Sequence, residues 1–366
     1  MSGGAALVKV VIPSVMRELT QGAELVEVEA SSLKEVIARL DEKFPGMRAL
    51  LVDEEGAPHP HVAFFVDGVD VARGDGLLTA VQAGSEIVIV PAISGGSAGL
   101  EDEFGDIVRK AREGQGLALD EVSRLTGLSP SVLAQFESYQ RAPERDESDR
   151  LAEALGLEKE ALWRIATGEY LPKVKGELAG LVVESFTFQP MGSHGYLLCR
   201  RDHEDTFLVD PGGSPEEIHG ALERLGRRLT AILVTHGHSD HIAGLEGVLA
   251  RWNVPVYAHP SECRHPRVVP VTESQELLVG KTWIRVIHTP GHTPNGLTFV
   301  VEGAAAVGDT LFAGSLGRAH QGPQYYDRLL TSARAILSLP DETWLLPGHG
   351  PLTTVGQEKR SNPFLA

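Results

Sequence analysis

Four side chains of the metal-binding type lie within six residues, directly after an apolar run that ends at Val234. They are His236, His238, Asp240 and His241. Residues two apart in an extended strand end project to the same side, so the first two imidazoles should face one point. The other two begin the following helix near that point. Because imidazole and carboxylate ligands suit zinc, iron or manganese, the fold must gather strand ends around a metal site.

Three further candidate ligands follow later apolar runs. His292, Asp309 and His349 each come after a predicted strand and beside a glycine. Loops carried by a rigid sheet commonly position functional side chains, so we expect these residues to converge with the first four. We expect His288 in the core or behind a ligand. The remaining histidines lack strand-end spacing and are expected at the surface or behind a ligand: His194, His203, His219, His259, His265 and His320.

Residues 182–366 carry these motifs and resemble the metallo-β-lactamase superfamily, with all seven expected ligand positions occupied. The resemblance implies an αββα sandwich and two metal ions. One metal would be held by His236, His238 and His292. The other would be held by Asp240, His241 and His349, with Asp309 bridging the two. In catalysis, Asp240 and Asp309 would orient the nucleophile.

The segments 308–318 and 347–364 are similar to the glyoxalase II-like branch, which hydrolyses thioesters and has persulfide dioxygenases as close relatives. The leading hypothesis is a metal-dependent hydrolase of an acyl-thioester that uses a metal-bound hydroxide. It would need two divalent metal ions, with zinc expected and iron or manganese as alternatives. The rival hypothesis is a mononuclear Fe(II) dioxygenase acting on a persulfide, because two histidines and Asp309 would form a facial iron site. Both activities use the same seven positions, so both stay open.

Residues 1–96 alternate in the manner of β-strands around one amphipathic stretch at 33–40, where Ser32 and Glu35 predict a capping box. The order strand–strand–helix–strand–strand, ending at Gly95-Gly96, resembles the ubiquitin-like sulfur carriers of molybdopterin synthase and the thiamine pathway. The resemblance implies a β-grasp domain and a sulfur-transfer protein as partner. Carrier chemistry needs a free carboxylate at Gly96, so cleavage there and a docking role without cleavage are both open. A further alternative is that the hydrolase acts on this tail.

Residues 102–170 follow a linker at 97–101 and are predicted to be all helical. One helix ends at Gly127, and Ser129 and Pro130 begin the next, which resembles a phage-repressor-type helix-turn-helix. The predicted recognition helix, 129–140, has no Lys or Arg, and residues 101–170 carry 9 basic against 16 acidic side chains. Phosphate attraction supplies much of the affinity for DNA, so we expect no DNA binding. A sulfur-responsive DNA-binding regulator is the non-enzymatic alternative.

The expected architecture is therefore multidomain, with β-grasp, helix-turn-helix and metallo-β-lactamase domains at 1–96, 102–170 and 171–366. The net charge of −17 disfavours general attraction to nucleic acids or anionic membranes. No apolar run approaches the roughly 20 residues that span a bilayer, and no signal peptide is predicted. Two cysteines among 366 residues suit a reducing compartment. We expect a cytoplasmic protein without membrane association, and a homodimer is left open.

Overall fold

The computed structural model describes residues 6–13, 16, 19–20, 23, 25–52, 58, 62–71, 76–91, 99–188, 191–319 and 322–365. The chain forms two compact units, one of residues 1–94 with 189–191 and the other of 95–188 with 192–366. The predicted Gly95-Gly96 tail lies outside the described residues, as does His320. No helix in the described part of the chain is long and apolar enough to cross a membrane.

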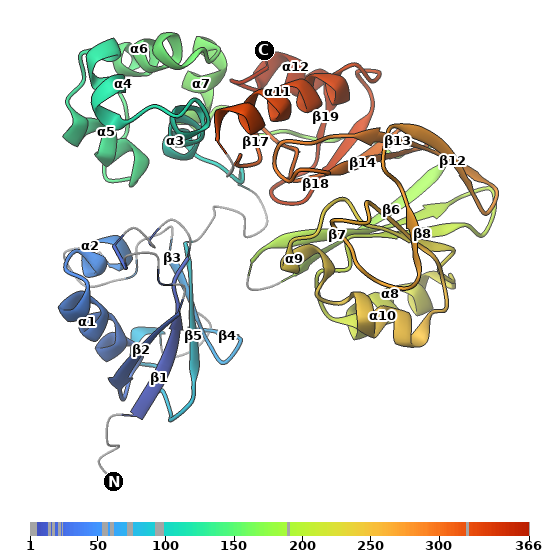
Figure 1. Ribbon diagram of the computed structural model, residues 1–366, viewed down its shortest axis with the longest axis horizontal. Helices are drawn as coiled ribbons and strands as arrows, with labels where there is room; N and C mark the ends of the chain where they lie inside the picture. Colours follow the sequence, from blue (N-terminus) through green and yellow to red (C-terminus); the bar gives the residue numbers. More distant parts are fainter. Residues whose placement is uncertain are drawn as a thin grey trace. The chain divides into compact units, whose positions relative to one another are not determined.

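The described residues of the first unit form a β-grasp fold, which confirms the predicted class (Figure 1). Its five-stranded sheet has the order β2-β1-β5-β3-β4, with β1 antiparallel to β2 and parallel to β5. The amphipathic helix α1 buries Leu33, Val36, Ile37 and Leu40. The elements are β1 (Ala6–Val11), β2 (Leu25–Ala30), α1 (Leu33–Lys43), α2 (Met47–Leu51), β3 (Val62–Val66), β4 (Val69–Asp70), η3 (Gly76–Leu78) and β5 (Glu86–Pro91).

The predicted capping box at the start of α1 forms only in part. The Ser32 hydroxyl accepts a hydrogen bond from the backbone N–H of Glu35, as expected for an N-cap. The Glu35 carboxylate, however, accepts from the backbone N–H and the hydroxyl of Ser31 rather than from the cap residue. The competing serine one position earlier therefore takes the returning bond.

The helix-turn-helix segment is all helical, as predicted. Gly127 ends its second helix in the left-handed conformation (φ 72°), and Ser129 caps the third, whose first residue is Pro130. A side chain other than glycine is strained at such a φ, so the turn favours glycine. The helices are α3 (Phe104–Gly114), α4 (Leu119–Thr126), α5 (Pro130–Glu137), α6 (Arg145–Leu155) and α7 (Lys159–Ala166).

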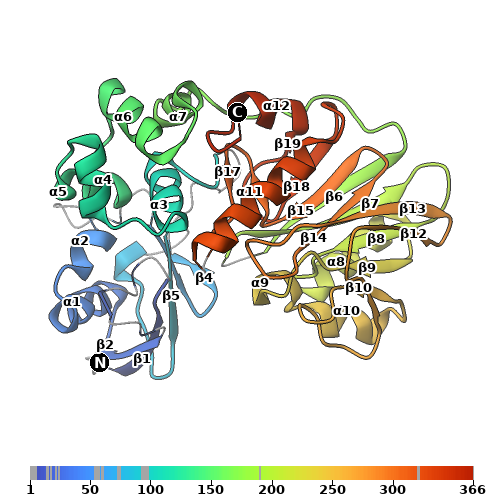
Figure 2. The ribbon, with the colours of Figure 1, turned by 45° about the horizontal axis from the view of Figure 1, so that its top comes forward.

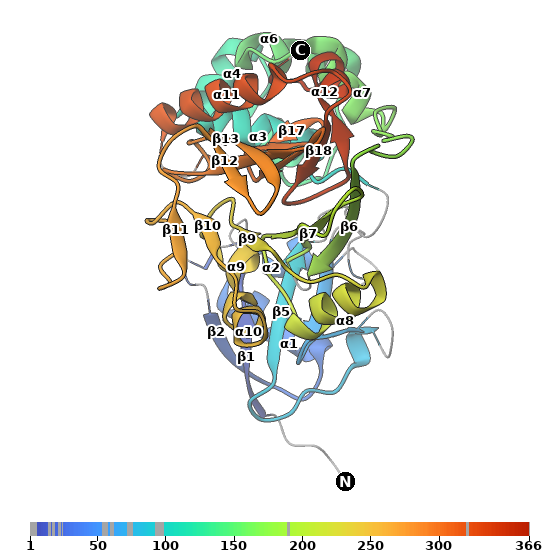
Figure 3. The same cartoon turned by 90° about the vertical axis from the view of Figure 1, so that its right-hand side faces the viewer.

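The rest of the second unit is an αββα sandwich, in which two six-stranded sheets among the described residues face each other (Figure 3). Alternation along β8 shows why the sheets pair: Phe207 and Val209 enter the core between the sheets, and Leu208 enters the core under the outer helices. The first half contains β6 (Leu181–Phe188), β7 (Ser193–Arg200), β8 (Thr206–Val209), α8 (Pro215–Leu225), β9 (Ala231–Leu233), α9 (Ser239–Ile242), α10 (Leu245–Arg251), β10 (Val256–Ala258) and β11 (Val268–Pro270). The second half contains β12 (Gln275–Val279), β13 (Thr282–His288), β14 (Leu297–Val301), β15 (Ala304–Gly308), β16 (Leu311–Phe312), β17 (Ser315–Leu316), α11 (Pro323–Leu337), β18 (Trp344–Pro347), β19 (Thr353–Thr354) and α12 (Val355–Ser361).

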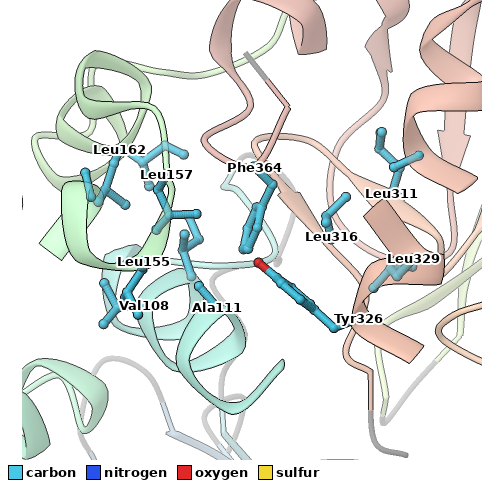
Figure 4. Packing of buried hydrophobic residues seen from close by; sticks show 14 of the residues in the cluster. Val108, Ala111, Leu155, Leu157, Leu162, Leu311, Leu316, Tyr326, Leu329 and Phe364 are labelled. Carbon is cyan, nitrogen blue, oxygen red and sulfur yellow. The ribbon is translucent and has the colours of Figure 1, made fainter. Parts of the chain in front are cut away.

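The helical segment and the second half of the sandwich share one hydrophobic core. Val108 and Ala111 of α3 belong to the same buried cluster as Leu329 of α11 and Phe364 (Figure 4). Helix α3 lies beside α11, and this close approach requires Gly114, because a Cβ there would lie 2.3 Å from the Tyr326 ring (Figure 2). The helix-turn-helix is therefore packed into the sandwich rather than tethered to it.

A buried carboxylate in α12 reinforces this junction. Glu358 is fully buried and accepts hydrogen bonds from the hydroxyls of Tyr170 (2.6 Å) and Thr353 (2.7 Å). It also accepts from the backbone N–H of Gly314 (2.9 Å) and the side-chain amide of Asn362 (3.0 Å). The carboxylate thus connects the segment that follows α7 to the turn between β16 and β17.

Candidate metal centre

The seven predicted ligand residues lie at one edge of the sandwich, where strands of both sheets end. His236 and His238 follow β9, and Asp240 and His241 lie in the short helix α9. His292, Asp309 and His349 follow β13, β15 and β18 of the other sheet. Because every one of these strands ends at the same edge, residues more than 100 positions apart in the sequence come into contact.

Four of these residues form a first group. His236, His238, His292 and Asp309 each offer a ligand atom, and these atoms all lie within 4.8 Å of one another. The Nε2 atom of His292 lies 3.0 Å from Nδ1 of His238 and 3.5 Å from Oδ2 of Asp309. Three imidazoles and a carboxylate at such spacing match the donor set of a divalent transition metal.

Asp240, His241 and His349 form a second group, whose ligand atoms also lie within 4.8 Å of one another. Nε2 of His349 is 3.4 Å from Oδ2 of Asp240, and Nε2 of His241 is 3.6 Å from the same atom. Asp309 reaches this group as well, with Oδ1 3.4 Å from His241 and Oδ2 3.6 Å from His349. Asp309 therefore lies between the two groups.

Several of the ligand-type atoms are buried and have no hydrogen bond to any residue that the structure describes. They include Nε2 of His236, Nε2 of His241 and Oδ1 of Asp309. Buried polar atoms nearly always have a partner, since losing water without replacement costs about 1–3 kcal/mol each. All three atoms face the interior of the cluster. A bound divalent cation would satisfy them, so the residues present fit a metal centre.

Burial and charge set the protonation of the cluster. Burial alone would raise the pKa of Asp309, but His349, His241 and His236 hold this pKa well below its usual range. Burial lowers the pKa of His236 far below that of a free imidazole. Burial also lowers the pKa of His349, but Asp309 and Glu101 outweigh it and raise this pKa to about 10. The cluster thus keeps an ionised carboxylate at its centre, as a metal ligand requires.

Asp210, which was not predicted from the sequence, holds two of the ligand segments together. Its side chain is buried and accepts hydrogen bonds from the backbone N–H (2.8 Å) and the hydroxyl (2.6 Å) of Thr235. It also accepts from Nδ1 of His241 (3.1 Å), which leaves Nε2 of this imidazole for the cluster. A carboxylate directly after β8, followed by Pro211 and two glycines, was the available signal.

Glu262 was missed in the same way. Its carboxylate accepts from the backbone N–H of Gly237 (3.1 Å) and from the backbone N–H of Asn295 (3.1 Å). It thereby connects the loop of His236 and His238 to the loop of His292. No spacing rule in the sequence marks this glutamate, because the contact joins loops far apart in the chain.

Gly348 allows the closest backbone approach at the centre. A Cβ at this position would lie 2.0 Å from Oδ1 of Asp309 and 2.7 Å from Cε1 of His241. Real Cβ atoms do not tolerate such distances, so the strand end that carries His349 reaches the cluster only with glycine there.

The histidines outside the ligand groups lie in different surroundings. His288 is half-buried and stacks on His259, with ring centroids 6.2 Å apart. The expectation that His219 lies at the surface or behind a ligand is wrong: it is 6% exposed and accepts a hydrogen bond from the Trp252 indole. It lies on the apolar face of α8, where the tryptophan N–H needs a buried acceptor.

Comparison with known proteins agrees with this architecture. Three family models match: the metallo-β-lactamase superfamily over residues 189–349, the ThiS family over 10–96 and a helix-turn-helix over 108–162. The probable metallo-hydrolase YqgX of Bacillus subtilis is 34% identical over 48% of this chain and 93% of its own length. The hydroxyacylglutathione hydrolase GloC of Haemophilus influenzae is 31% identical over 45% of this chain and 89% of its own length. A solved structure, the B3 metallo-β-lactamase BLEG-1, is 32% identical over 50% of this chain and its whole length, with a TM-score of 0.45.

The sandwich, the cluster of histidines and aspartates at its edge, and a relative matched over nearly its whole length agree with one another. The chain belongs to the metallo-β-lactamase superfamily of metal-dependent hydrolases and carries a ThiS-family domain and a helix-turn-helix domain ahead of the hydrolase.

Proposed function

We propose that this protein is a dinuclear metal-dependent hydrolase of thioesters. The observation that carries the proposal is the pair of adjoining ligand groups with Asp309 between them. His236, His238 and His292 would hold one divalent cation. Asp240, His241 and His349 would hold the other, and Asp309 would contact both.

Two divalent cations bound here would lower the pKa of a shared water molecule toward ~7 and polarise the carbonyl of the substrate. Zinc is the proposed metal, since histidine and aspartate side chains are its ordinary ligands. The chain supplies the geometry. Asp210 fixes the ring of His241, and Glu262 connects the two loops of the first group, so hydrogen bonds of 3.1 Å from these two carboxylates hold the ligand segments in place.

Asp240 and Asp309 are the proposed catalytic carboxylates. Burial works to raise the pKa of Asp240, but the hydrogen bond from His349 and the charge of His241 outweigh it and lower this pKa. Both carboxylates are therefore ionised at neutral pH. An ionised oxygen beside the attacking water can accept its hydrogen bond and orient it toward the carbonyl carbon.

The substrate class is supported by chemistry and by a relative. GloC is named a hydroxyacylglutathione hydrolase, and it shares 31% identity with this chain. A thiolate leaves readily because thiols have a pKa of about 8.5. Hydrolysis of a thioester therefore needs less proton donation to the leaving group than hydrolysis of an ester.

The test measures metal content and two activities on the purified full chain. We expect two zinc ions per chain by elemental analysis, and release of free thiol from a hydroxyacylglutathione thioester. Asp309→Asn changes a proposed ligand itself. It should therefore lower the rate by more than the ~10–100-fold that is typical when a hydrogen-bond partner of a metal ligand (an outer partner) is removed. Asp327→Asn, at an exposed position of α11, is the matched control and should leave the rate unchanged.

Two metals without any thioester cleavage would refute the proposal. A single iron per chain, with oxygen uptake on glutathione persulfide, would instead establish the dioxygenase. The first ligand group is sufficient by itself for this activity. It contains histidines and a carboxylate, which are the ligand types of a mononuclear iron site: His236, His238, His292 and Asp309.

For partners, we propose a sulfur-transfer protein that contacts the ThiS-family domain, and no DNA. In α5 the acidic Glu137 is buried and is paired with Arg112 at 2.6 Å, so that arginine is not available to phosphate. Fluorescence anisotropy with random-sequence duplex DNA at low salt should show no saturable binding. Binding that weakens steeply with salt would contradict this part of the proposal.

A further inference from the structure

The helical domain reaches the metal centre through the segment just before α3. Lys110 of α3 forms an ion pair with Asp102 and donates a hydrogen bond to the backbone carbonyl of Leu316 (2.7 Å). Its ammonium also lies 5.0 Å from the centroid of the Phe312 ring. These contacts are largely buried, so they fix the start of α3 against the β16–β17 hairpin.

This attachment places Glu101 against the loop that carries His349. The backbone of Glu101 packs on Gly350, where an added Cβ would lie 2.9 Å from Cβ of Glu101. One carboxylate oxygen, Oε1, then lies 3.8 Å from Nδ1 of His349. The two side chains are only 11% and 9% exposed, so the contact is shielded from solvent.

The ligand histidines differ in what their Nδ1 atoms contact. Nδ1 of His241 donates to Asp210, and Nδ1 of His292 donates to the carbonyl of Arg318 (2.9 Å). Both outer partners belong to the sandwich itself. Nδ1 of His349, by contrast, is buried and has no hydrogen bond within the described residues. The carboxylate it faces, that of Glu101, comes from the segment just before the helical domain.

We propose that Glu101 is a positioning residue for His349, contributed to the metal centre by the segment that leads into the helix-turn-helix domain. The inference rests on the proposed function, in which His349 binds a metal through Nε2. A move of about 1 Å brings the 3.8 Å pair to the ~2.9 Å of a hydrogen bond. Such a bond keeps the proton on Nδ1, so that Nε2, which lies 3.4 Å from Asp240 and 3.6 Å from Asp309, would give its lone pair to a bound cation.

This arrangement gives the helical domain a role other than DNA recognition. Its first helix shares a core with α11, and its entry segment completes the surroundings of one ligand. The metal centre and the docking of the helical domain are then coupled. Loss of the carboxylate should weaken one metal site and leave the other intact.

The test measures metal affinity by chelator competition on the full chain. Glu101→Ala should weaken the more labile of the two metals by about 10–100-fold while the tighter one is unchanged, as for removal of other outer partners. Glu101→Gln keeps a side-chain oxygen that can accept from Nδ1 and should restore most of the affinity. With cobalt as the probe metal, the visible absorption bands of the weakened site should shift in Glu101→Ala and return toward the original in Glu101→Gln.

Two control variants separate positioning from mere folding. Glu153→Ala removes an exposed carboxylate of the helical domain that pairs with Lys159, and should change neither affinity nor spectrum. Lys110→Met loosens the docking contacts without touching His349, so it should lower the melting temperature more than the metal affinity.

Unchanged affinity of both metals in Glu101→Ala overturns the inference, and so does a loss of affinity in Glu101→Gln as large as that in Glu101→Ala. These outcomes differ from failure of the proposed function, which would appear in the unmodified chain as fewer than two metals or as absent thioester cleavage.

Discussion

Replacing Asp210 with asparagine tests the hydrogen bonds that orient His241. The carboxylate accepts three hydrogen bonds, from the backbone N–H of Thr235 through Oδ1, and from the Thr235 hydroxyl and Nδ1 of His241 through Oδ2. Asparagine has only one acceptor oxygen. If that oxygen stays with the backbone N–H, the amide N–H₂ faces Nδ1 of His241. That nitrogen must then give up its proton, and the proton moves to Nε2, which faces the metal cluster.

The magnitude follows from this change of tautomer. Loss of an outer partner of a ligand histidine lowers metal affinity by about 10–100-fold. This corresponds to about 1.4–2.7 kcal/mol of binding free energy. A lost hydrogen bond to a charged acceptor costs a further ~1.5–3 kcal/mol of stability even in the metal-free chain.

The assay is chelator competition on Asp210→Asn, together with urea unfolding of the metal-free protein. Asp205→Asn is the matched control, because Asp205 is equally placed at a strand end and accepts from Lys281 N (2.6 Å) and the Thr282 hydroxyl (2.8 Å). It contacts none of the seven ligand residues. We expect similar losses of stability in both variants and a loss of metal affinity only in Asp210→Asn. Unchanged metal affinity in Asp210→Asn, or an equal loss in the control, would refute the reasoning.

Three further predictions concern stability, metal binding and pH. Tyr170→Phe removes a 2.6 Å hydrogen bond to buried Glu358 and should lower the free energy of unfolding by ~1.5–3 kcal/mol, or the melting temperature by about 3–5 °C in a thermal scan. Gly348→Ala should abolish tight metal binding, measured by elemental analysis after dialysis, because its Cβ would collide with Asp309 at 2.0 Å. Burial lowers the pKa of His194 to about 4, so stability should fall by at most roughly 3 kcal/mol as the pH drops from 6.5 to 4, measured by urea unfolding.

Each of these three predictions can be refuted by a specific result. A melting temperature in Tyr170→Phe that matches the unmodified chain would show that the Glu358 network does not stabilise the junction. A metal-replete Gly348→Ala would show that the loop adjusts freely. Stability falls as the pH drops from 6.5 to 4 because the unfolded chain binds a proton on His194 in this range and the folded chain does not. His194→Gln should therefore flatten the unfolding free energy across this range, and an unchanged slope would assign it to other groups.

The local elements were predictable because each depends on short-range rules. The amphipathic spacing of α1 and the cap at Ser129 agree with the structure, as does the turn at Gly127. The seven candidate ligands were visible because strand ends followed by His or Asp are locally unusual. The cap of α1 was only half right, since Ser31 and Ser32 compete for one carboxylate and local rules do not rank them.

What the sequence determined by itself is therefore the three-part architecture and the chemistry of the ligand-type side chains, because composition and periodicity are carried by neighbouring residues. Tertiary structure alone decided which groups support those ligands. Asp210 meets His241 across 31 positions, Glu262 connects two loops, and Glu101 reaches His349 from the segment that precedes the helical domain. Such contacts depend on where strands end and domains pack in space, and no local pattern records the distance between residues that the fold brings together.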